Sequence, residues 1–215
     1  AFLLISMMLS GQASAFDVDG FSYTVIGTTT DVVVTGRASG NSATDINIPD
    51  TVTNNGTIYS VTTIGDSAFR DNALTSVTIG NSVTTIENQA FYRNDLTSVT
   101  IGNSVTTIGV LAFFSNELTS VTIPDGVTTI GDSAFYFNAL TSVTIPDSVT
   151  TIGNLAFNVN NLTSVTIGNS VETIGRGAFN NNRLTSLTLP DSVTTIGPYA
   201  FRTSSLTSVT IPDSV

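Results

Sequence analysis

A unit of 22 residues recurs along most of this chain, because its phenylalanines and leucines keep fixed positions in the repeat. The phenylalanines are Phe69, Phe91, Phe113, Phe135, Phe157, Phe179 and Phe201. The leucines are Leu74, Leu96, Leu118, Leu140, Leu162, Leu184 and Leu206. A strict period of about 20 to 50 residues indicates a solenoid, in which each repeat forms one coil and packs only on its neighbours. We therefore predict a mainly β solenoid of 22-residue coils.

Residues 118–139, LTSVTIPDGVTTIGDSAFYFNA, represent one coil. Val121 and Ile123 are two residues apart and face the same side of a predicted strand, which the β-branched Thr, Val and Ile favour. Residues 124–126, Pro-Asp-Gly, predict a turn, because Pro fixes φ and Asp bonds nearby backbone amides. Residues 127–130 form a second short extended segment with apolar ends.

The rest of the coil predicts a bend into the next one. Gly131 suits a positive φ or a close approach of two backbones. Residues 132–135 predict a single helical or 3₁₀ turn, with Asp132 or Ser133 as its cap. Asn138 then turns the chain into the following coil.

Two further columns accompany the apolar side chains that the stacked coils bury in one continuous core. An invariant alanine precedes each core phenylalanine and predicts a tight position: Ala68, Ala90, Ala112, Ala134, Ala156, Ala178 and Ala200. An asparagine column predicts a ladder in which each side-chain amide bonds the backbone of the next loop. Its members are Asn72, Asn94, Asn116, Asn138, Asn160 and Asn182, and Ser204 replaces asparagine in the last full coil.

The motif L-T-S-V-T-I-P-D-S-V-T-T-I-G-x-x-A-F, seen at residues 140–157, resembles the BspA-like class of leucine-rich repeats. The resemblance covers residues 46–215 and includes an irregular first coil. Residues 16–45 resemble the N-terminal β-hairpin cap of such domains, which covers apolar side chains at an open coil end. The resemblance implies a secreted or surface-attached protein that binds an extracellular or surface protein, often in adhesion.

The sequence leads to separate predictions for the two ends of the chain. Residues 1–15 combine a short apolar run with Ala13-Ser14-Ala15, which predicts a truncated signal peptide cleaved after Ala15. The alternative is a buried N-terminal helix or strand; the run is too short to span a membrane, so we expect no membrane insertion of the mature chain. The chain stops within a repeat, so we expect the solenoid at 46–215 to be C-terminally truncated. Its open edge at Val209 and Ile211 predicts self-association, because uncapped strands pair readily.

Composition argues against several classes of function. The net charge is −10, with 6 Lys+Arg against 16 Asp+Glu, and nucleic acids or anionic membranes need a basic footprint instead. The chain has no Lys, His, Cys or Trp, which removes the usual catalytic bases and nucleophiles. We therefore expect no enzyme, no cofactor and no metal site. Asp125 and Asp147 could share a weak Ca²⁺, but turn chemistry is the better account of their column.

An array of Ser-x-Thr pairs is expected to face outward on the strands. Its members are Ser76/Thr78, Ser98/Thr100, Ser120/Thr122, Ser142/Thr144, Ser164/Thr166, Ser186/Thr188 and Ser208/Thr210. Regular hydroxyl arrays on solenoids resemble ice-binding surfaces, which makes ice binding a minor alternative function. Threonine is also an ordinary residue for an exposed strand position.

The position after each core phenylalanine varies, so the repeat itself does not dictate the residue there. Three successive coils place Tyr92, Phe114 and Tyr136 at this position. We expect Phe137 to add to this patch, and Arg70 and Arg93 to lie beside it. Aromatic residues and arginine are enriched at binding hot spots, so these six are the candidate partner-binding residues. The alternative is an intramolecular aromatic stack. A structural or spacer role for the whole repeat domain is the main alternative to recognition.

Overall fold

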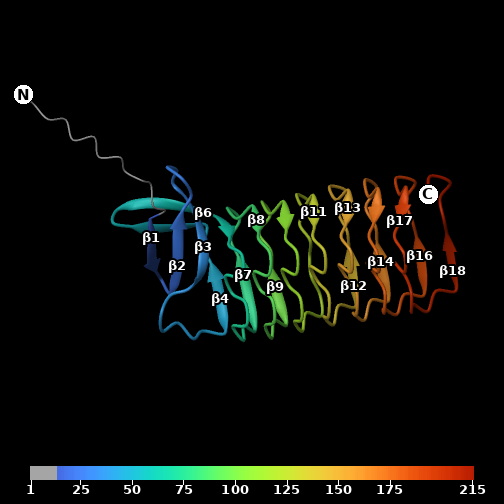
Figure 1. Cartoon of the computed structure of the whole chain (residues 1–215), viewed down its shortest axis with the longest axis horizontal. Coiled ribbons are helices and arrows are strands. Elements are labelled where there is room, and N and C mark those ends of the chain that lie inside the picture. The colour runs from blue at the N-terminus through green and yellow to red at the C-terminus, as the bar shows by residue number, and fades with distance from the viewer. Residues whose placement is uncertain (1–13) are drawn as a thin grey trace, which may run out of the picture.

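The computed structural model describes residues 14–215, so residues 1–13, with most of the expected signal peptide, lie outside the described part. Residues 14–215 contain strands and turns and no helix. Figure 1 shows a β unit at one end of a long stack of coils, with the C-terminus at the other end. The predicted β solenoid with an N-terminal hairpin is therefore confirmed.

The N-terminal unit is antiparallel and joins the solenoid through one parallel pair. The strands β1 (Ala15–Val18), β2 (Phe21–Val25) and β3 (Asp31–Arg37) pair in sequence order. β3 then pairs in parallel with β6 (Thr57–Ile64), against which β5 (Thr51–Asn54) folds back. These strands are the first members of the long sheet of the solenoid, so the hairpin covers the first coil and also starts its sheet.

Tyr23 anchors the core of this N-terminal unit. Its side chain is fully buried and its ring contacts those of Phe16 and Phe21, with ring centroids 5.5 and 6.4 Å away. The hydroxyl group has no hydrogen-bond partner among the described residues. Burial, and to a smaller extent the negative charge of Asp19, raises the pKa of Tyr23 to about 12.

The coils present two rows of short parallel strands, which Figure 1 shows along opposite edges of the stack. The row in the long sheet consists of β8 (Thr85–Ile86), β10 (Thr107–Ile108), β11 (Thr129–Ile130), β13 (Thr151–Ile152), β15 (Thr173–Ile174) and β17 (Thr195–Ile196). The Ser-x-Thr row consists of β4 (Asp45–Ile48), β7 (Ser76–Ile79), β9 (Ser98–Thr100), β12 (Ser142–Thr144), β14 (Ser164–Thr166), β16 (Ser186–Thr188) and β18 (Ser208–Thr210). Paired residues of β4 and β7 differ by 31 in number, because the first coil carries an insertion, and paired residues of the later coils differ by 22, as at Thr107 and Thr129, so the coils stack in register.

The Ser-x-Thr row is broken into three separate sheets, β4-β7-β9, β12-β14 and β16-β18. The strand predicted around Val121 is absent, because residues 120–122 have no regular strand pairing with either neighbouring coil. The turn predicted at residues 124–126 is present, and Val127 N–H donates to Pro124 C=O at 3.0 Å. Strand pairing is therefore interrupted on the Ser-x-Thr side, while the long sheet stays continuous.

The phenylalanine column forms one unbroken stack through the core. Ring centroids of consecutive phenylalanines lie between 5.2 and 5.6 Å apart, and the rings are parallel to within 10°. These spacings lie just above the distance of about 4.8 Å between neighbouring strands. The alanine column is buried beside this stack, from Ala68 to Ala200, as predicted. Gly131 takes the close-approach alternative, since a Cβ there would lie 2.6 Å from the backbone of Gly109.

The asparagine column forms the expected ladder from Asn94 to Asn182, but these rungs bond the preceding coil and not the next loop, and Asn72 bonds Arg70 C=O within its own coil. Asn116 Oδ1 accepts from Leu96 N–H at 3.2 Å, and its Nδ2 donates to Phe91 C=O at 3.0 Å. Asn160 repeats this arrangement with Leu140 and Phe135. These backbone groups of the preceding coil lie outside its strands, so the buried amide supplies the partners that no strand provides.

The helical turn predicted at residues 132–135 is wrong. Ser133 and Phe137 have left-handed φ angles of 56° and 60°, which no right-handed helical turn contains. The N–H groups of Ser133, Phe135 and Phe137 donate to carbonyl groups of the next coil, at 2.7 to 3.0 Å. In a helical turn, these N–H groups would bond carbonyl groups of their own coil. The hydrogen bonds to the next coil therefore take the place of the predicted turn.

The tight alanine position leads to a stability prediction. We expect Ala134→Leu to overpack the core and lower the free energy of unfolding by about 1–3 kcal/mol. Ala139→Leu is the matched control, because its column carries Glu117 and Arg183 in other coils. Urea unfolding of both variants measures the difference. Equal stabilities of Ala134→Leu and the parent chain would contradict the packing described above.

The end of the ladder leads to a second prediction. Ser204 Oγ is buried without a hydrogen-bond partner among the described residues. An asparagine at this position would accept a hydrogen bond from Leu184 N–H. Ser204→Asn should therefore add a rung and raise the free energy of unfolding by about 1 kcal/mol. The reverse change, Asn160→Ser, should lower it by about 1–3 kcal/mol because it strands buried backbone groups. Thermal melting of the pair provides the test, and a shift of the same sign in both would refute the ladder.

Candidate functional site

Tyr92, Phe114 and Tyr136 lie side by side on three consecutive coils and form what we call the aromatic stripe. Each residue follows a core phenylalanine, and each side chain is half-buried. The rings of Tyr92 and Phe114 stack with centroids 4.9 Å apart and planes 11° apart. Phe114 meets Tyr136 edge-on, with centroids 5.1 Å apart and planes at 90°. The structure thus brings together the three rings that the sequence suggested.

Both candidate arginines lie beside the first ring of the aromatic stripe. The guanidinium carbons of Arg70 and Arg93 lie 4.8 and 5.1 Å from the centroid of Tyr92. Arg70 is also held by its own neighbours, because it donates to Asp71 Oδ2 at 3.1 Å and to Gln89 Oε1 at 2.7 Å. Two of its donor groups are therefore occupied within the protein, and Arg93 is the more available donor at this end of the stripe.

Phe137 does not join the stack of the aromatic stripe. Its left-handed backbone separates its side chain from that of Tyr136, although the two residues are adjacent. The ring of Phe137 is 57% exposed and lines another hollow, together with Thr119, Val159 and Asn161. Sequence adjacency therefore grouped Phe137 with the wrong surface.

The column of Phe137 is left-handed in every coil without containing a glycine. Its members are Asp71, Arg93, Ser115, Phe137, Val159, Asn181 and Thr203, with φ between 51° and 60°. Asp and Asn tolerate this conformation, whereas a β-branched residue such as Val159 is strained in it. The hydrogen bonds between coils impose the conformation, since Val159 N–H donates to Asn180 C=O at 3.1 Å.

A second cluster of arginine and tyrosine, which we call the C-terminal cluster, was not evident from the sequence. The guanidinium carbons of Arg176 and Arg202 lie 5.9 and 5.5 Å from the ring centroid of Tyr199. The three residues belong to three different columns of the repeat, so no single column reveals them. The signal that could have found them is that Arg202 occupies the same column as Arg70.

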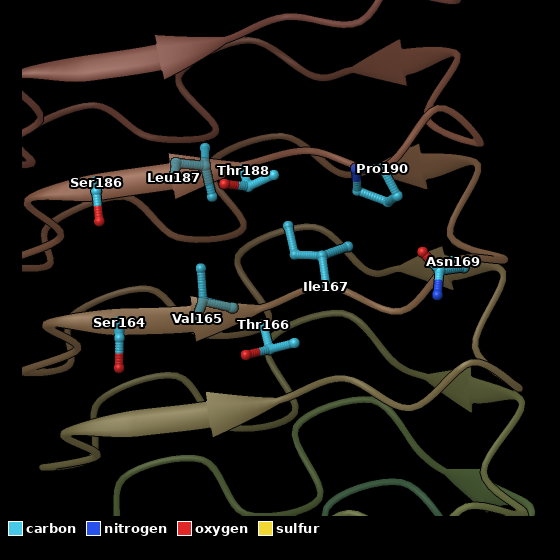
Figure 2. Close-up of a pocket in the computed structure, with 9 residues that line it drawn as sticks. All are labelled: Ser164, Val165, Thr166, Ile167, Asn169, Ser186, Leu187, Thr188 and Pro190. Atoms are coloured by element: carbon cyan, nitrogen blue, oxygen red, sulfur yellow. The ribbon is translucent and has the colours of Figure 1, made fainter.

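The Ser-x-Thr face is not a uniform plane. Figure 2 shows a hollow between β14 and β16, where Val165 and Ile167 extend towards the gap between the two coils. Its volume is about 320 Å³, and Ser164 and Ser186 lie at its rim. A similar hollow separates residues 120–123 from β12. The division of this row into three sheets, with hollows between them, interrupts the hydroxyl array on which the ice-binding alternative depends.

Carboxylates and amides of the turns bond the backbone of neighbouring coils. Asp147 Oδ1 accepts from Asn169 N–H at 2.6 Å, and Asn81 Oδ1 accepts from Asn103 N–H at 2.9 Å. At the first coil, hydrogen bonds from Ser76 and Thr75 lower the pKa of the exposed Asp45. The described part of the chain holds no group of three acidic residues with the geometry of a metal site. Within the same residues, no helix has the length and apolarity to cross a membrane.

A family model described as "BspA type Leucine rich repeat region" matches six copies, over residues 38–160 and 151–215. A solved leucine-rich cell surface protein from Faecalibacterium prausnitzii is 32% identical with a TM-score of 0.77, covering 94% of this chain and 55% of that protein. A leucine-rich repeat protein from Bacteroides ovatus is 31% identical with a TM-score of 0.84, covering 93% and 54% respectively. This chain thus spans about half the length of either structure.

The pneumococcal vaccine antigen PcpA shares the fold, with 23% identity and a TM-score of 0.59 over 94% of this chain and 51% of the antigen. No match was found among curated proteins.

The left-handed column leads to a prediction at Val159. Replacing this β-branched residue by asparagine, which already occupies the column at Asn181, should relieve backbone strain and raise the free energy of unfolding by about 1 kcal/mol. Val159→Thr is the control, because it adds polarity but keeps the branched Cβ. Urea unfolding of the two variants separates the effects. An equal change in both would show that polarity, and not the backbone conformation, sets the stability there.

Proposed function

This chain belongs to the BspA-type leucine-rich repeat family, and from that premise we propose that it is a non-enzymatic module that recognises another protein outside the cell. Leucine-rich repeats of this family and fold are typically non-enzymatic interaction modules. The relative from Faecalibacterium prausnitzii is described as a cell surface protein, which supports a secreted or cell-surface location here. Adhesion to a surface protein of a host or a neighbouring cell is the specific role that we propose.

The aromatic stripe is the single observation that carries this proposal. Its three half-buried rings occupy a position that varies between coils, so the fold does not require aromatic residues there. Stacking between Tyr92, Phe114 and Tyr136 holds the rings in place before any partner arrives. Preordered aromatic side chains lose little conformational entropy on binding, which favours their use as anchors.

The charges around the stripe define the kind of partner surface that fits. Arg93 lies against Tyr92 and makes no side-chain hydrogen bond within residues 14–215. It can therefore donate to a carboxylate or carbonyl group of a partner at the rim of an apolar contact. The proposed partner surface thus combines an apolar centre over the rings with an acceptor group opposite Arg93.

Two alternatives differ from this proposal in their requirements. A spacer role needs only the stacked coils and gives the aromatic stripe no purpose beyond its own packing. Ice binding needs an evenly spaced face, and the hollows beside β12 and β14 do not support one. We therefore rank recognition through the aromatic stripe above both alternatives.

Binding of residues 16–215 to an array of purified extracellular and surface proteins tests the proposal. The test variant combines Tyr92→Ser, Phe114→Ser and Tyr136→Ser, and we expect it to weaken a saturable interaction by at least about tenfold, since hot-spot aromatic residues each contribute more than about 1 kcal/mol. Phe137→Ser is the matched control, because it removes an exposed aromatic ring that lies outside the stripe.

Thermal melting of each variant establishes that the solenoid is intact before binding is compared. Loss of affinity in the triple variant alone supports recognition through the stripe. Full affinity in the triple variant for every partner found, or the absence of any partner, would favour the spacer role.

A further inference from the structure

The hollow beside Phe137, which we call the Phe137 hollow, crosses four consecutive coils. Thr97, Glu117, Ala139 and Asn161 line it, one from each coil, and its volume is about 570 Å³. Three steps between coils give it a length of about 14 Å at the usual strand spacing, which about four residues of an extended chain would span. Further coils are stacked on both sides of these four, so the hollow lies within the stack and not at an open end.

Two apolar residues from one column line the Phe137 hollow. Phe137 and Val159 are neighbours in the left-handed column, with φ angles of 60° and 52°. The other members of this column are polar or charged: Asp71, Arg93, Ser115, Asn181 and Thr203. A bulky or β-branched side chain is strained at a positive φ, and the ring of Phe137 is also 57% exposed. Neither the core nor the backbone conformation accounts for these two apolar residues, whereas contact with an apolar group from outside the chain does.

Thr119 leaves a backbone donor unused in the same hollow. Thr97 N–H and Thr141 N–H each donate to the threonine carbonyl of the preceding coil, at 3.0 and 3.2 Å. Thr119 N–H has no backbone acceptor within residues 14–215, next to the interruption of strand pairing at residues 120–122. Thr119 lines the hollow, so this N–H can donate to a carbonyl group of an extended chain bound there.

The part of the chain that forms the Phe137 hollow is acidic. Residues 94–175 contain six acids and no basic residue. The acids are Asp95, Glu117, Asp125, Asp132, Asp147 and Glu172. The nearest arginine in the column of Phe137 is Arg93, two coils or about 10 Å away.

Two of these acids are unpaired at one end of the hollow. Asp95 and Glu117 share a column in successive coils, and both are exposed. Neither forms an ion pair within residues 14–215, where Arg70 and Asp71 do. Like charges in neighbouring coils repel each other, and a cationic group of a partner relieves that repulsion. The charge and the apolar lining together select a partner that is both basic and apolar.

We propose that the Phe137 hollow binds a short extended segment of a partner protein in which lysine or arginine flanks an apolar residue. The apolar side chain packs on Phe137 and Val159, and the basic side chain pairs with Glu117 and Asp95. Residues two apart on an extended chain face the same side and lie about 6.6 Å apart, which a lysine side chain can bridge to the next coil. The hollow is separate from the aromatic stripe, so this inference goes beyond the function proposed for the stripe.

NMR titration of ¹⁵N-labelled residues 16–215 with acetylated and amidated pentapeptides tests the proposal. The main probe is Lys-Gly-Leu-Gly-Lys, which presents lysine on both sides of leucine and so fits either chain direction. Three further probes change one feature each: glutamate replaces lysine, serine replaces leucine, or hexylammonium replaces the peptide. We expect the main probe to bind with a Kd of about 1 mM or below and to shift the amide signals of residues 117–119 and 137–139. The other probes should bind at least about tenfold more weakly.

Two variants with matched controls locate the binding. Phe137→Ser should weaken the main probe by at least about tenfold, whereas Tyr199→Ser removes an equally exposed ring elsewhere and should change the affinity by less than about twofold. Glu117→Gln should weaken the probe by at least about fivefold. Asp125→Asn removes the same charge from a turn outside the hollow, in a column that already holds asparagine, and should have an effect of less than about twofold.

Val159→Asn separates binding from stability. Relief of backbone strain should raise the free energy of unfolding, while loss of the apolar contact should weaken the main probe by at least about fivefold. A purely structural role for Val159 would instead leave the affinity unchanged. The triple serine variant of the aromatic stripe should bind the probe with unchanged affinity, so the two surfaces are tested independently.

Several results would overturn the proposal. One is the absence of a saturable shift with the main probe at millimolar concentration, and another is full affinity in Phe137→Ser. An equal loss of affinity in Glu117→Gln and Asp125→Asn would reduce the attraction to diffuse electrostatics. Equally tight binding of hexylammonium at the same residues would make the hollow a site for small amines and not for a peptide.

Discussion

The structure depends on one constraint, which is that a residue of a regular coil meets its own equivalent in the next coil about 4.8 Å away. A column persists only if its side chain packs well against a copy of itself. Phenylalanine meets this condition by parallel stacking, from Phe69 to Phe201. Asparagine meets this condition in another way. Each buried amide bonds the backbone of the preceding coil, so the equivalent amide of the next coil can form its own bonds in the same manner. The buried polar ladder and the aromatic stack thus fix the same register.

This constraint also decides how much of the fold the sequence could reveal. The columns of phenylalanine, alanine and asparagine are visible in the sequence because the register preserves them, and so the solenoid and its core could be predicted. The conformation of Ser133 could not, since Asp-Ser-Ala-Phe has ordinary local signals for a helical turn. Bonds from residues 133, 135 and 137 to the next coil override those signals, and local propensity contains no information about them.

The hydrogen bonds between coils also limited how much of the candidate site could be predicted, because they set backbone conformations that local sequence does not indicate. The aromatic stripe could be recognised because its three rings share one column, and a column places residues side by side. Phe137 was assigned to the stripe by adjacency, but its left-handed φ of 60° directs the ring elsewhere. The C-terminal cluster escaped prediction for a related reason, because Tyr199 also has a left-handed φ, of 64°, and meets arginines from other columns.

The bends that follow the long sheet are more regular than the Ser-x-Thr face, because ring stacks and bonds between coils hold them where the opposite row of strands divides into three sheets. Both the aromatic stripe and the C-terminal cluster lie on these bends. Tyr92 and Tyr199 are five coils apart, or about 24 Å at the usual strand spacing. This separation exceeds the screening length of about 8 Å at physiological ionic strength, so the charges of one arginine cluster are largely screened from the other. The aromatic stripe and the C-terminal cluster are therefore electrostatically separate groups on the same edge of the solenoid.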